Sequence, residues 1–567
     1  MIEKLQRCKS LNDIAKLLGY KPSSLAYLLY YFPENKKYFE FEIPKKTEGT
    51  RKILAPEPKL KLLQHRLATV LADCYQETYL DHEKYAQPLA FGFAPGLSIF
   101  ENANKHKNKK FVLNVDIKDF FTSINFGRVR GFFIKNKYFK LNPKVSTIIA
   151  QIACYSNQLP QGSPCSPIIS NLIATQLDAR LVSLARKSKC TYSRYADDLT
   201  FSTNFKEFPN NLAIEQNENN SNKLGNDLVS IIENSGFHVN LRKVSLQFKR
   251  SRQVATGLVV NKKVNVANEY YRQARSMCNV LFKTDSYYFD NEKNNPTINK
   301  LLGMINFIYW IKIGWECSKK NTNVKNNQKN DTGIVKLYKK LILYKYFVNP
   351  SKLVILTEGK TDKIYLKYAL QSLCLKNKYP ELIKKISDKP EKFEYAFSFV
   401  NIRNTIIHDL FKIPSGTSGL VKLSDRLMKS YDEEIYTSPL SFKKTVVIVC
   451  DNDDSGKEVF NKVSKKQKNV IKILDMKVAN FKDFLFVIKV PKDTNGVIED
   501  LFPEKVLKTS LKGKEFLYKV KKNKKLNLET QYGKSVFASK VVKQQWKQID
   551  FSKFESLFDA ISKIISK

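Results

Sequence analysis

Two adjacent aspartates, Asp197 and Asp198, interrupt a short run of β-prone and apolar residues that extends from Tyr192 to Phe201. Adjacent side chains of a strand point to opposite faces, so a tight hairpin is needed to present both carboxylates at one edge of a sheet. Two carboxylates held so close repel each other, and a divalent metal ion removes that repulsion. We therefore expect a metal-binding hairpin here. An acidic turn on the surface is the alternative that these two residues alone leave open.

A second acid-bearing segment lies upstream. Residues 111–117 form an apolar run that predicts a buried strand, with Asp116 near its end. Asp116, Asp197 and Asp198, carried by two strands, can together hold two Mg²⁺ ions, which is the arrangement that serves in-line phosphoryl transfer. The sequence therefore predicts a site for phosphoryl transfer at the end of this strand.

The charge of the chain points to its partner. The chain has 567 residues, enough for roughly three or four domains, and 43% of them are hydrophobic, so sizeable cores can form. Its 97 Lys and Arg against 54 Asp and Glu give a net charge of +43. Nucleic acid is the polyanion that such an excess favours. A coding bias that enriches Lys and Asn is the alternative explanation.

Cysteine and histidine usage excludes other classes of site. The nine cysteines are scattered without a C-x-x-C pair, and the five histidines do not cluster with them. A zinc site or a disulfide framework is therefore not expected. The N-terminus lacks the apolar core of a signal peptide, and no apolar run reaches about 18 residues. We expect a soluble bacterial protein of the cytoplasm that does not contact a membrane.

Apolar periodicity and turn residues predict the elements around these acids. Helices are expected over 1–35, 59–80, after the glycine turn at 91–99, over 143–156, from 168, over 225–234 and through most of 268–316. Strands are expected at 39–44, after a turn within 235–243 and, as a short strand, at 255–261. Residues 204–224 are expected to form an Asn-rich loop. The basic hairpin that contains Arg51 can contact a triphosphate or a template, with a solvated hairpin as the alternative.

Three further features of this half could contribute to a nucleotide site. The Pro, Gly and Ser loop at 159–167, which contains Gln161, opens a helix and lets phosphate approach its N-terminus. The ring of Phe120, four residues beyond Asp116, can exclude a 2′-hydroxyl if it lies beside a nucleotide sugar, and a place in the core is the alternative. Lys243 could protonate or neutralise a leaving pyrophosphate, or be an ordinary surface lysine.

Two more buried strands in the second half also end in acids. Glu358 follows the first strand, and Asp451 and Asp453 follow the second. Sites of open α/β sheets form at the carboxyl ends of the strands, so we expect these three acids to meet and bind Mg²⁺. Glu499 and Asp500 add acids near the same edge. Helix capping is the alternative role for any one of them.

The rest of the second half connects and extends this predicted sheet. The polar stretch 318–333 is expected to be a linker, followed by a helix at 334–347 and, after Glu358, another at 362–375. Residues 505–567 are Lys-rich, most of all at 521–525. We expect the run 521–525 to be a solvated loop, or else a contact with RNA or DNA.

Residues 1–316 resemble the reverse transcriptases of bacterial retrons. The resemblance rests on the order of five motifs, which are Asp116-Ile117-Lys118-Asp119-Phe120-Phe121, Leu159-Pro160-Gln161-Gly162-Ser163-Pro164, Tyr195-Ala196-Asp197-Asp198, Asn102-Ala103-Asn104-Lys105-His106 and Ala255-Thr256-Gly257. The fourth motif matches the N-A-x-x-H segment that separates retron enzymes from other reverse transcriptases. The fifth stands where the family has V-T-G, with alanine in place of valine.

Residues 351–503 resemble a Toprim domain of the kind found in OLD-family nucleases. Glu358-Gly359-Lys360-Thr361-Asp362 and Asp451-Asn452-Asp453 match its acidic motifs, and Glu499-Asp500 resembles a further acidic element. The combination is similar to retron reverse transcriptases of the Ec67 type, which carry such a fusion.

The two resemblances imply a fold and a domain order. They imply an α+β right-hand polymerase with fingers, palm and thumb, followed by an α/β Toprim domain with a mainly parallel sheet. The expected domains are fingers and palm at 1–265, thumb at 266–316, a linker and connecting helix at 317–350, and the Toprim nuclease domain with a basic extension at 351–567.

The resemblance also implies an activity and its partners. The polymerase copies part of a structured non-coding RNA into single-stranded DNA from dNTPs, primed by the 2′-hydroxyl of a branching guanosine, and so makes a branched RNA–DNA product (msDNA). Host ribonuclease H removes the template. The Toprim domain is then the nuclease effector of an anti-phage system, with cellular RNA such as tRNA, or DNA, as its substrate. Self-association stays open.

The implied site residues follow from the motifs. Two Mg²⁺ ions would be held by Asp116, Asp197 and Asp198, and one or two by the Toprim acids Glu358, Asp451, Asp453, Glu499 and Asp500. The residues expected near the nucleotide are Arg51, Phe120, Gln161 and Lys243. Those expected to recognise the RNA are Asn102, His106, Thr256 and Gly257.

Three alternatives stay beside this interpretation. The Toprim half could be inactive and only a scaffold for nucleic acid, although its acidic motifs are intact. The polymerase could be of the group II intron or diversity-generating kind, against which the Asn102–His106 segment and the lack of a maturase-like or HNH region argue. A primase or topoisomerase role for the Toprim half is the third, and the fold alone does not decide it.

Overall fold

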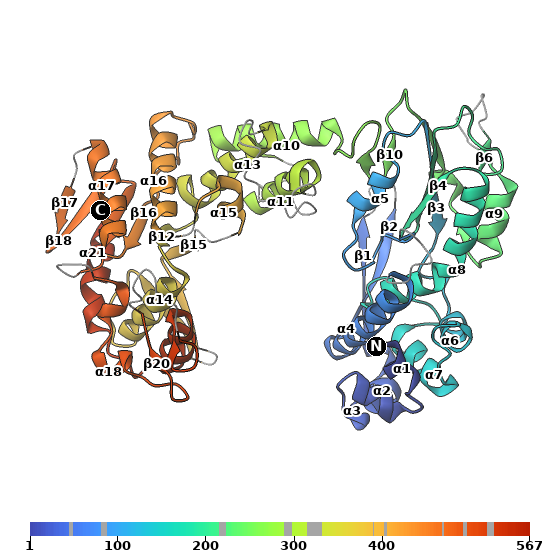
Figure 1. The fold of residues 1–567 in the computed structure, drawn as a ribbon, viewed down its shortest axis with the longest axis horizontal. Helices are drawn as coiled ribbons and strands as arrows, with labels where there is room; N and C mark the ends of the chain where they lie inside the picture. Colours follow the sequence, from blue (N-terminus) through green and yellow to red (C-terminus); the bar gives the residue numbers. More distant parts are fainter. Residues whose placement is uncertain are drawn as a thin grey trace. The chain divides into compact units, whose positions relative to one another are not determined.

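The computed structural model describes residues 1–44, 49–80, 88–214, 223–288, 297–314, 332–388, 391–401, 405–414, 416–467, 470–491, 496–518 and 527–566. The chain forms two compact units (Figure 1). The first is Met1–Asn268 with Ile311–Lys319, and the second is Glu269–Trp310 with Lys320–Lys567. The helices expected to form a thumb are therefore grouped with the C-terminal unit.

The first unit begins with short helices and a hairpin, as the sequence predicts. The helices are α1 (Ile2–Gln6), α2 (Leu11–Leu17) and α3 (Pro22–Ala26). Ser10 and Asp13 form a capping box at the start of α2, which explains why a helix begins there. The hairpin pairs β1 (Tyr38–Pro44) with β2 (Thr50–Pro56), and α4 (Pro58–Tyr75) follows it.

The centre of the first unit is an antiparallel sheet in the order β4-β5-β3-β8, with β9 also paired to β3. Its strands are β3 (Phe111–Lys118), β4 (Thr191–Tyr195), β5 (Asp198–Thr203), β8 (His238–Val239) and β9 (Ser245–Phe248), and the helices around it are α5 (Ile99–Lys105), α6 (Phe126–Lys135), α7 (Pro143–Ala153), α8 (Ser166–Lys187) and α9 (Asn226–Glu233). Leu113, Leu199 and Phe201 are fully buried between sheet and helices. This is the α+β arrangement that the sequence predicts.

Two local predictions need revision in this unit. The segment 255–261 is a small hairpin rather than one strand, with β10 (Val254–Ala255) and β11 (Leu258–Val259) joined by Thr256 and Gly257. Both turn residues have positive φ, 46° and 79°, as a two-residue hairpin turn requires. In the predicted loop 204–224, β6 (Ala213–Ile214) pairs with β7 (Lys223–Leu224); residues 215–222 lie outside the described part of the chain.

The second unit begins with a group of helices, α10 (Asn268–Thr284), α11 (Ile298–Tyr309) and α13 (Gly333–Leu343). Tyr338 of α13 donates a hydrogen bond to Asn306 of α11 at 3.1 Å and its ring packs on that of Tyr309. The predicted connecting helix is therefore part of a packed layer. Most of the predicted linker, residues 315–331, lies outside the described residues.

The main sheet of the second unit has the order β15-β12-β16-β19-β18-β17. The strands β15 (Phe397–Asn401), β12 (Leu353–Thr357), β16 (Val446–Cys450) and β19 (Leu485–Lys489) are parallel neighbours, and β18 (Met476–Phe481) and β17 (Val470–Ile473) complete it in antiparallel pairings. All residues of β12 and β16 are buried, as is usual for strands covered on both faces. The prediction of a mainly parallel sheet is confirmed.

The helices that follow these strands are α14 (Lys360–Cys374), α15 (Thr405–Phe411), α16 (Thr417–Asp432) and α17 (Asp454–Gln467). Smaller elements are the hairpin of β13 (Ile383–Asp388) and β14 (Glu391–Tyr395), the helix α18 (Glu504–Leu507), and the pair β20 (Glu515–Phe516) and β21 (Gln531–Tyr532).

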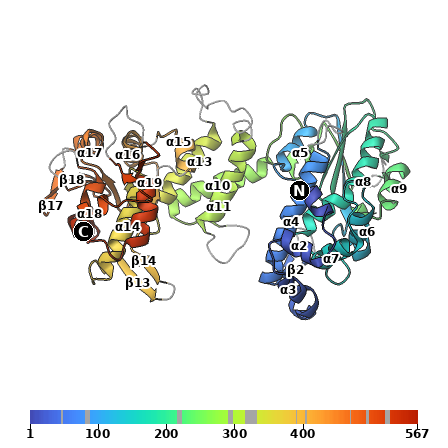
Figure 2. The same cartoon turned by 60° about the horizontal axis from the view of Figure 1, so that its bottom comes forward.

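The described part of the Lys-rich C-terminal extension belongs to the core of the second unit. The extension contains α19 (Lys534–Val536), α20 (Lys543–Gln545) and α21 (Glu555–Ile565); α19 lies beside α14 (Figure 2), and α21 contributes to the same core. Phe537, Phe551 and Phe554 are fully buried there, and the ring of Tyr365 from α14 packs on that of Phe537. Large apolar residues spaced along the Lys-rich sequence make this segment part of the core. Lys521–Lys525 lies outside the described residues.

Candidate active sites

The predicted acidic hairpin is present in the first unit. Asp198 of β5 is paired with Asp116 of β3, and the backbone N–H of Ile117 donates to the carbonyl of Asp197 at 2.9 Å. The turn between β4 and β5 is formed by Ala196 and Asp197, and Ala196 has a φ of 55°. The sheet therefore brings the three aspartates together at the ends of two paired strands.

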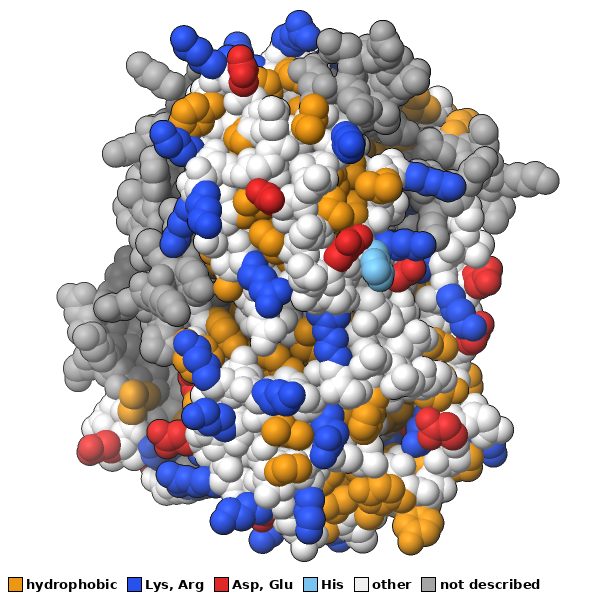
Figure 3. Space-filling model, turned by 90° about the vertical axis from the view of Figure 1, so that its right-hand side faces the viewer, with side chains coloured by type: hydrophobic (Ala, Val, Ile, Leu, Met, Phe, Trp, Pro, Cys, Tyr) orange, Lys and Arg blue, Asp and Glu red, His pale blue; other side chains and the backbone are white. Residues whose placement is uncertain are grey.

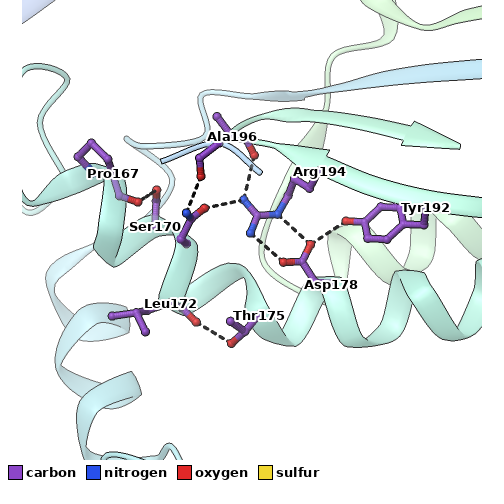
Figure 4. Close-up of polar contacts among 10 residues, drawn as sticks. Pro167, Ser170, Leu172, Thr175, Asp178, Tyr192, Arg194 and Ala196 are labelled. Atoms are coloured by element: carbon purple, nitrogen blue, oxygen red, sulfur yellow. Dashed lines mark hydrogen bonds and ion pairs between the residues drawn. The ribbon is translucent and has the colours of Figure 1, made fainter. Parts of the chain in front are cut away.

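A buried ion pair holds this turn, and the sequence analysis missed it. The side chain of Arg194 is fully buried and donates to both carboxylate oxygens of Asp178 at 2.8 Å (Figure 4). Its remaining N–H groups donate to the carbonyl of Ala196 and the side chain of Asn171, both at 3.1 Å. A Cβ on Gly92 would lie 2.5 Å from the amide nitrogen of Ala196, so only glycine fits there. An arginine inside an otherwise buried strand is itself a signal for a buried partner.

Lys243 contacts the acid on β3 rather than standing free. Asp116 is 6% exposed, and it accepts hydrogen bonds from Lys243 Nζ and from Asn240 Nδ2, both at 2.9 Å. The hydrogen bond and charge of Asp116 raise the pKa of Lys243, so this lysine stays protonated. In the absence of substrate, Lys243 therefore neutralises one of the three acids.

The charged forms of the other two acids, Asp197 and Asp198, are destabilised by burial and by neighbouring negative charge. Burial raises the pKa of Asp198 to about 6, and the charges of Asp197 and Asp116 add to the effect. Burial also raises the pKa of Asp197, together with the charge of Asp116, while Lys243 and Arg51 oppose the shift. Arg51 is thus close enough to act on these acids through its charge. A cation bound between them would relieve their repulsion.

The three carboxylates of the first unit suit a hard divalent ion, but they do not by themselves complete its coordination shell. Its donors are all carboxylate oxygens, which Mg²⁺ prefers. Throughout the described ranges, no group of three or more His, Cys, Asp or Glu side chains is close enough to hold an ion as it stands. Mg²⁺ usually takes only one or two carboxylates and completes its shell with water and substrate phosphates. Asp116, Asp197 and Asp198 suit that mode of binding.

The prediction that Phe120 faces a nucleotide sugar is wrong in this structure. Phe120 is 2% exposed, and its ring stacks on Phe237 with the centroids 5.5 Å apart. The neighbouring Phe121 is only half-buried, and its ring lies 6.0 Å from that of Phe93. Of the two adjacent rings, Phe121 is therefore the one that can reach a ligand beside the acids.

The loop that contains Gln161 is fastened to the hairpin that carries Arg51. The backbone carbonyl of Gln161 accepts from the N–H of Leu54 on β2 at 2.8 Å. Gly162 has a φ of 126°, and a Cβ there would lie 2.5 Å from the carbonyl oxygen of Leu54. The half-buried Gln161 and the exposed Arg51 thus belong to one rigid corner.

Asn102 and His106, which are expected to help recognise RNA, are fully buried, so neither side chain is exposed for direct contact with RNA in this structure. The two ring nitrogens of His106 lie 2.7 Å from the hydroxyls of Ser193 and Ser202. Burial, with the charges of two nearby lysines, lowers the pKa of His106 to about 3, so the ring is neutral. The hydroxyl of Ser193 also donates to Asn102 Oδ1 at 2.6 Å. These side chains fix helix α5 to strands β4 and β5.

Thr256 and Gly257 lie at the hairpin turn that α5 supports. The amide of Asn102 points to the hydroxyl of Thr256 at 3.5 Å, and that hydroxyl lies 3.4 Å from the carbonyl of Ile99. Gly257 has open space around its α-carbon. Asn102 therefore connects this turn with strand β4.

The second unit also brings acids together at its sheet edge. Glu358 and Asp451 follow the adjacent parallel strands β12 and β16. The hydroxyl of Thr417 donates to Glu358 Oε1 at 2.7 Å, and Glu358 Oε2 is buried without a hydrogen-bond partner. Burial raises the pKa of Asp451 to about 8, with further contributions from Asp362 and Glu358. This edge holds negative charge that the described residues leave poorly compensated.

Two of the predicted metal ligands have structural partners. Asp453 Oδ1 accepts from the backbone N–H of Gly456 at 2.8 Å at the start of α17, which is the capping role that the sequence left open. Asp500 accepts from the N–H of Val497 at 3.1 Å and from the hydroxyl of Tyr518 at 2.9 Å. Asp453 and Asp500 therefore stabilise local backbone in this structure.

Glu499 has a cationic partner that the sequence analysis did not find. Lys534, from the C-terminal segment, donates to Glu499 Oε2 at 2.8 Å, and Glu499 is fully buried. The other oxygen, Oε1, is buried without a hydrogen-bond partner. Burial raises the pKa of Glu499, and Lys534 opposes the shift. Nothing in the Lys-rich sequence marks one lysine out for an acid 35 residues away.

The residues at this edge fit a divalent ion in part. Glu358 and Glu499 each offer a buried oxygen without a partner, and Asp451 carries a raised pKa. As in the first unit, the described carboxylates do not form a complete cluster. Glu358 and Asp451 are the residues best suited to hold Mg²⁺, with Glu499 as a further donor.

Comparison with known proteins identifies the first unit. Residues 43–281 match the family described as reverse transcriptase (RNA-dependent DNA polymerase). Retron Ec86 reverse transcriptase of Escherichia coli is 31% identical over 274 residues, which cover 48% of this chain and 78% of that protein. Retron Mx65 reverse transcriptase of Myxococcus xanthus is 29% identical over 327 residues, covering 52% and 68%.

Among solved structures, telomerase from Candida albicans in complex with a telomeric RNA fragment aligns with a TM-score of 0.30 and 11% identity, covering 54% of this chain and 59% of that one. This value is too low to define the fold. In the described helices, none is long and apolar enough to cross a membrane.

The acidic hairpin and the family match define an RNA-directed DNA polymerase, an enzyme class that generally depends on divalent metal. The chain belongs to the retron reverse transcriptase family. The relatives reported above cover about half of this chain, so the second unit must be interpreted from its own geometry.

Proposed function

We propose that the first unit copies part of a structured non-coding RNA into DNA, starting from the 2′-hydroxyl of a branching guanosine. The observation that carries this proposal is the pairing of Asp116 with Asp198 beside Asp197. Each step joins a hydroxyl oxygen to the α-phosphorus of a dNTP and releases pyrophosphate. The product is a branched RNA–DNA molecule (msDNA), from which host ribonuclease H removes template.

The residues around the acids have separate tasks in this proposal. Asp116, Asp197 and Asp198 would hold two Mg²⁺ ions, which would supply activation of the attacking hydroxyl and charge stabilisation of the leaving pyrophosphate. Arg51 and Lys243 supply positive charge to the triphosphate, and Lys243 is already positioned by Asp116 at 2.9 Å. Gln161 orients the nucleotide and template from the corner that it shares with Arg51. Thr256 and Gly257 contact the RNA, and Asn102 and His106 position them.

Selection of deoxyribose falls to Phe121 in this proposal, because Phe120 is 2% exposed and belongs to the core. Phe121→Ala should increase ribonucleotide incorporation relative to deoxyribonucleotide by roughly 10- to 100-fold, the usual range of pocket discrimination. Phe120→Ala is the matched control, and it should lower stability while leaving the ratio unchanged. An unchanged ratio in Phe121→Ala would exclude the assignment.

The test of polymerisation uses the full chain expressed with its RNA. Asp197→Asn combined with Asp198→Asn should abolish the RNA–DNA product while protein yield stays the same. Asp227→Asn, an exposed acid on α9, is the control and should leave synthesis intact. Persistent product from the double variant contradicts the proposed site.

We infer that the second unit is a metal-dependent Toprim nuclease that acts as the effector of an anti-phage system. Glu358 and Asp451 at the ends of neighbouring parallel strands, with the unpartnered Glu358 Oε2, support this function. Its substrate is cellular RNA, such as tRNA, or DNA. The structural role of Asp453 favours the second candidate, a non-catalytic scaffold for nucleic acid.

Two variants separate these candidates. Glu358→Ala should leave DNA synthesis intact and remove both toxicity and defence if the unit is a nuclease. Glu458→Ala, an exposed acid on α17, is its control. If Glu358→Ala still defends fully, the scaffold interpretation is correct.

The nuclease needs a restraint, since a permanently active one would damage its own host. The RNA–DNA product is the polyanion made by the same chain, and the net charge of +43 gives it many binding positions. We propose that this product, together with self-association of the protein, blocks the Toprim site until infection alters or degrades it. The polymerase-inactive double variant should then lose defence, and growth assays decide whether it becomes toxic.

A further inference from the structure

A cavity of about 300 Å³ lies in the first unit between α6, α8 and the turn after α9. It is lined by Arg128, Gly131, Phe132, Lys135, Asn136, Ile173, Gln176, Leu177, Arg180, Asn234, Ser235 and Phe237. None of these residues belongs to the acidic site described above. The volume is at the lower end of the range for ligand sites, about 300–1,000 Å³.

The charged residues of this cavity are all positive. Arg128, Lys135 and Arg180 line it together with no carboxylate. Arg128 donates to the carbonyls of Ser235 at 2.6 Å and Gly236 at 2.8 Å, and Arg180 donates to the carbonyl of Asn234 at 3.2 Å. Neutral carbonyls orient these guanidinium groups without cancelling their charge. In the described parts of the chain, none of the three cations forms an ion pair, so the cavity attracts an anion.

The floor of the cavity is apolar and aromatic. Phe132, Ile173, Leu177 and Phe237 are buried, and the guanidinium of Arg128 lies 4.1 Å from the centroid of the Phe237 ring. The exposed amide of Gln176 offers both donors and an acceptor beside this floor. Positive charge, a guanidinium that lies over an aromatic ring and an amide together suit a phosphate joined to a planar heterocycle. Figure 3, which views the molecule from the side where α6, α8 and α9 lie in Figure 1, shows Lys and Arg side chains spread among apolar ones.

We propose that this cavity binds one nucleoside phosphate unit, with its base beside Arg128 and Gln176 and its phosphate at Lys135 and Arg180. The unit is either an unpaired nucleotide of a bound RNA or a free nucleotide. The site is separate from the polymerisation site. Its floor is nevertheless connected to that site, because Phe237 stacks on Phe120 in the loop after Asp116. An RNA anchored here would be held while its other parts move through the polymerase.

The test compares two double variants of the full-length protein. Lys135→Gln with Arg180→Gln removes the two exposed cations of the cavity. Lys144→Gln with Arg186→Gln removes one exposed lysine and one exposed arginine elsewhere on the same unit and serves as the matched control. The probes are a fluorescent single-stranded oligoribonucleotide, the same oligonucleotide in a duplex, and adenosine monophosphate. Circular dichroism and extension of a simple primed template monitor folding and basal activity, which should stay unchanged.

If an unpaired RNA nucleotide is the ligand, the cavity variant binds the single strand roughly tenfold more weakly than the control variant. The plot of the logarithm of its RNA affinity against the logarithm of salt concentration also becomes less steep, by about one to two units more than in the control variant. If a free nucleotide is the ligand, only the cavity variant loses binding of adenosine monophosphate in calorimetry, and RNA affinity equals that of the control. Equal behaviour of the two variants towards all three probes overturns the proposal.

A crosslink gives an independent readout. Single-stranded RNA that contains 4-thiouridine should crosslink to peptides spanning α6 and α8 around Phe132 and Gln176 in the unmodified protein, and less so in the cavity variant. Crosslinks confined to other peptides contradict an RNA nucleotide in this cavity.

Discussion

The two acidic sites of this protein balance their charge in different ways. In the first unit, Lys243 binds Asp116 at 2.9 Å, and the pKa of Asp198 rises only to about 6. In the second unit, the pKa of Asp451 rises to about 8, and Glu358 keeps a buried oxygen without a partner. At neutral pH Asp198 is therefore ionised, whereas Asp451 still holds a proton.

The difference follows from where each site stands in its fold. The first lies at a hairpin on an antiparallel sheet, and basic residues from β2 and the segment after β8 reach it. The second lies at the ends of fully buried parallel strands, where burial itself penalises the charged carboxylates. Its nearest cation, Lys534, is bound to Glu499. A metal ion at the first site would therefore meet an ionised Asp198, whereas one at the second site would have to displace the proton of Asp451.

The largest expected effect is a reciprocal loss of activity. Asp198→Asn should lower DNA synthesis by roughly 1000-fold or more without lowering cleavage by the proposed nuclease. Asp451→Asn should do the opposite, because each acid serves only its own site. Parallel assays of DNA synthesis and of nucleic-acid cleavage with the same preparations measure both. Loss of both activities in either variant would mean that the two sites do not act separately.

Removing the cation that is paired with a buried acid should destabilise the first unit more than the second. Arg194→Met leaves Asp178 as a buried unpaired charge and should cost about 3–5 kcal/mol of local stability. Lys534→Met should cost less, about 1–3 kcal/mol, because Lys534 is half-buried and water can partly replace it. Hydrogen exchange of peptides from β4 and from β16 measures the two units separately.

The controls for these two variants are exposed cations of the same units. Arg186→Met and Lys540→Met should leave exchange at β4 and β16 unchanged, because neither side chain is buried. Equal protection in Arg194→Met and Arg186→Met would show that the buried ion pair does not hold the hairpin.

Magnesium binding should respond to pH at only one of the sites. Binding of Mg²⁺ to the second site must displace the proton of Asp451, so its affinity should rise by up to about tenfold per pH unit between pH 6 and 8 and then level off. The first site should change little over this range, because Asp198 is ionised above about pH 6. Titration calorimetry of Glu358→Ala and of Asp198→Asn, each lacking one site, separates the two profiles. Identical profiles would remove the contrast between the sites.

The sequence anticipates strand-borne acids better than their surroundings. Asp116, Asp197, Glu358 and Asp451 could be placed because apolar runs and turn residues define the strands that carry them. The partners Arg194 and Lys534 could not, since they reach the acids through tertiary packing that no local pattern encodes. The choice between Phe120 and Phe121 failed for a related reason: sequence spacing does not reveal which of two adjacent rings the fold buries.

The C-terminal segment shows the same limit on a larger scale. Its lysines dominate the composition, and the only local structure that they predict is a solvated loop at 521–525. Folding is instead directed by the spaced aromatic residues Phe537, Phe551 and Phe554, which the core of the second unit buries. Lysines can remain at the surface while such a segment packs, so composition alone does not separate a tail from a docked helix.

The smallest expected effect is on stability: in the metal-free protein, removal of Asp198 and removal of Asp451 should stabilise their units by different amounts and over different pH ranges. A carboxyl group with a raised pKa in the folded state destabilises the fold once pH exceeds its unfolded value near 3.9, and the penalty grows until the folded pKa is reached. For Asp198 the penalty therefore grows between about pH 4 and 6, and for Asp451 between about pH 4 and 8. Asp198→Asn and Asp451→Asn should each stabilise their own unit at pH 8.5, by about 1 kcal/mol and about 2 kcal/mol respectively. At pH 4 neither substitution should matter.

The measurement is hydrogen exchange of β5 and β16 peptides in chelator across this pH range, with Asp227→Asn as a control for general charge. The gain from Asp198→Asn should stop growing near pH 6, while that from Asp451→Asn continues to pH 8. Addition of Mg²⁺ should reverse both gains, because the ion stabilises the unsubstituted acids and not the amides. If the two gains level off at the same pH, the charge balance of the two sites is alike, and the proton held by the second site has no part in its metal binding.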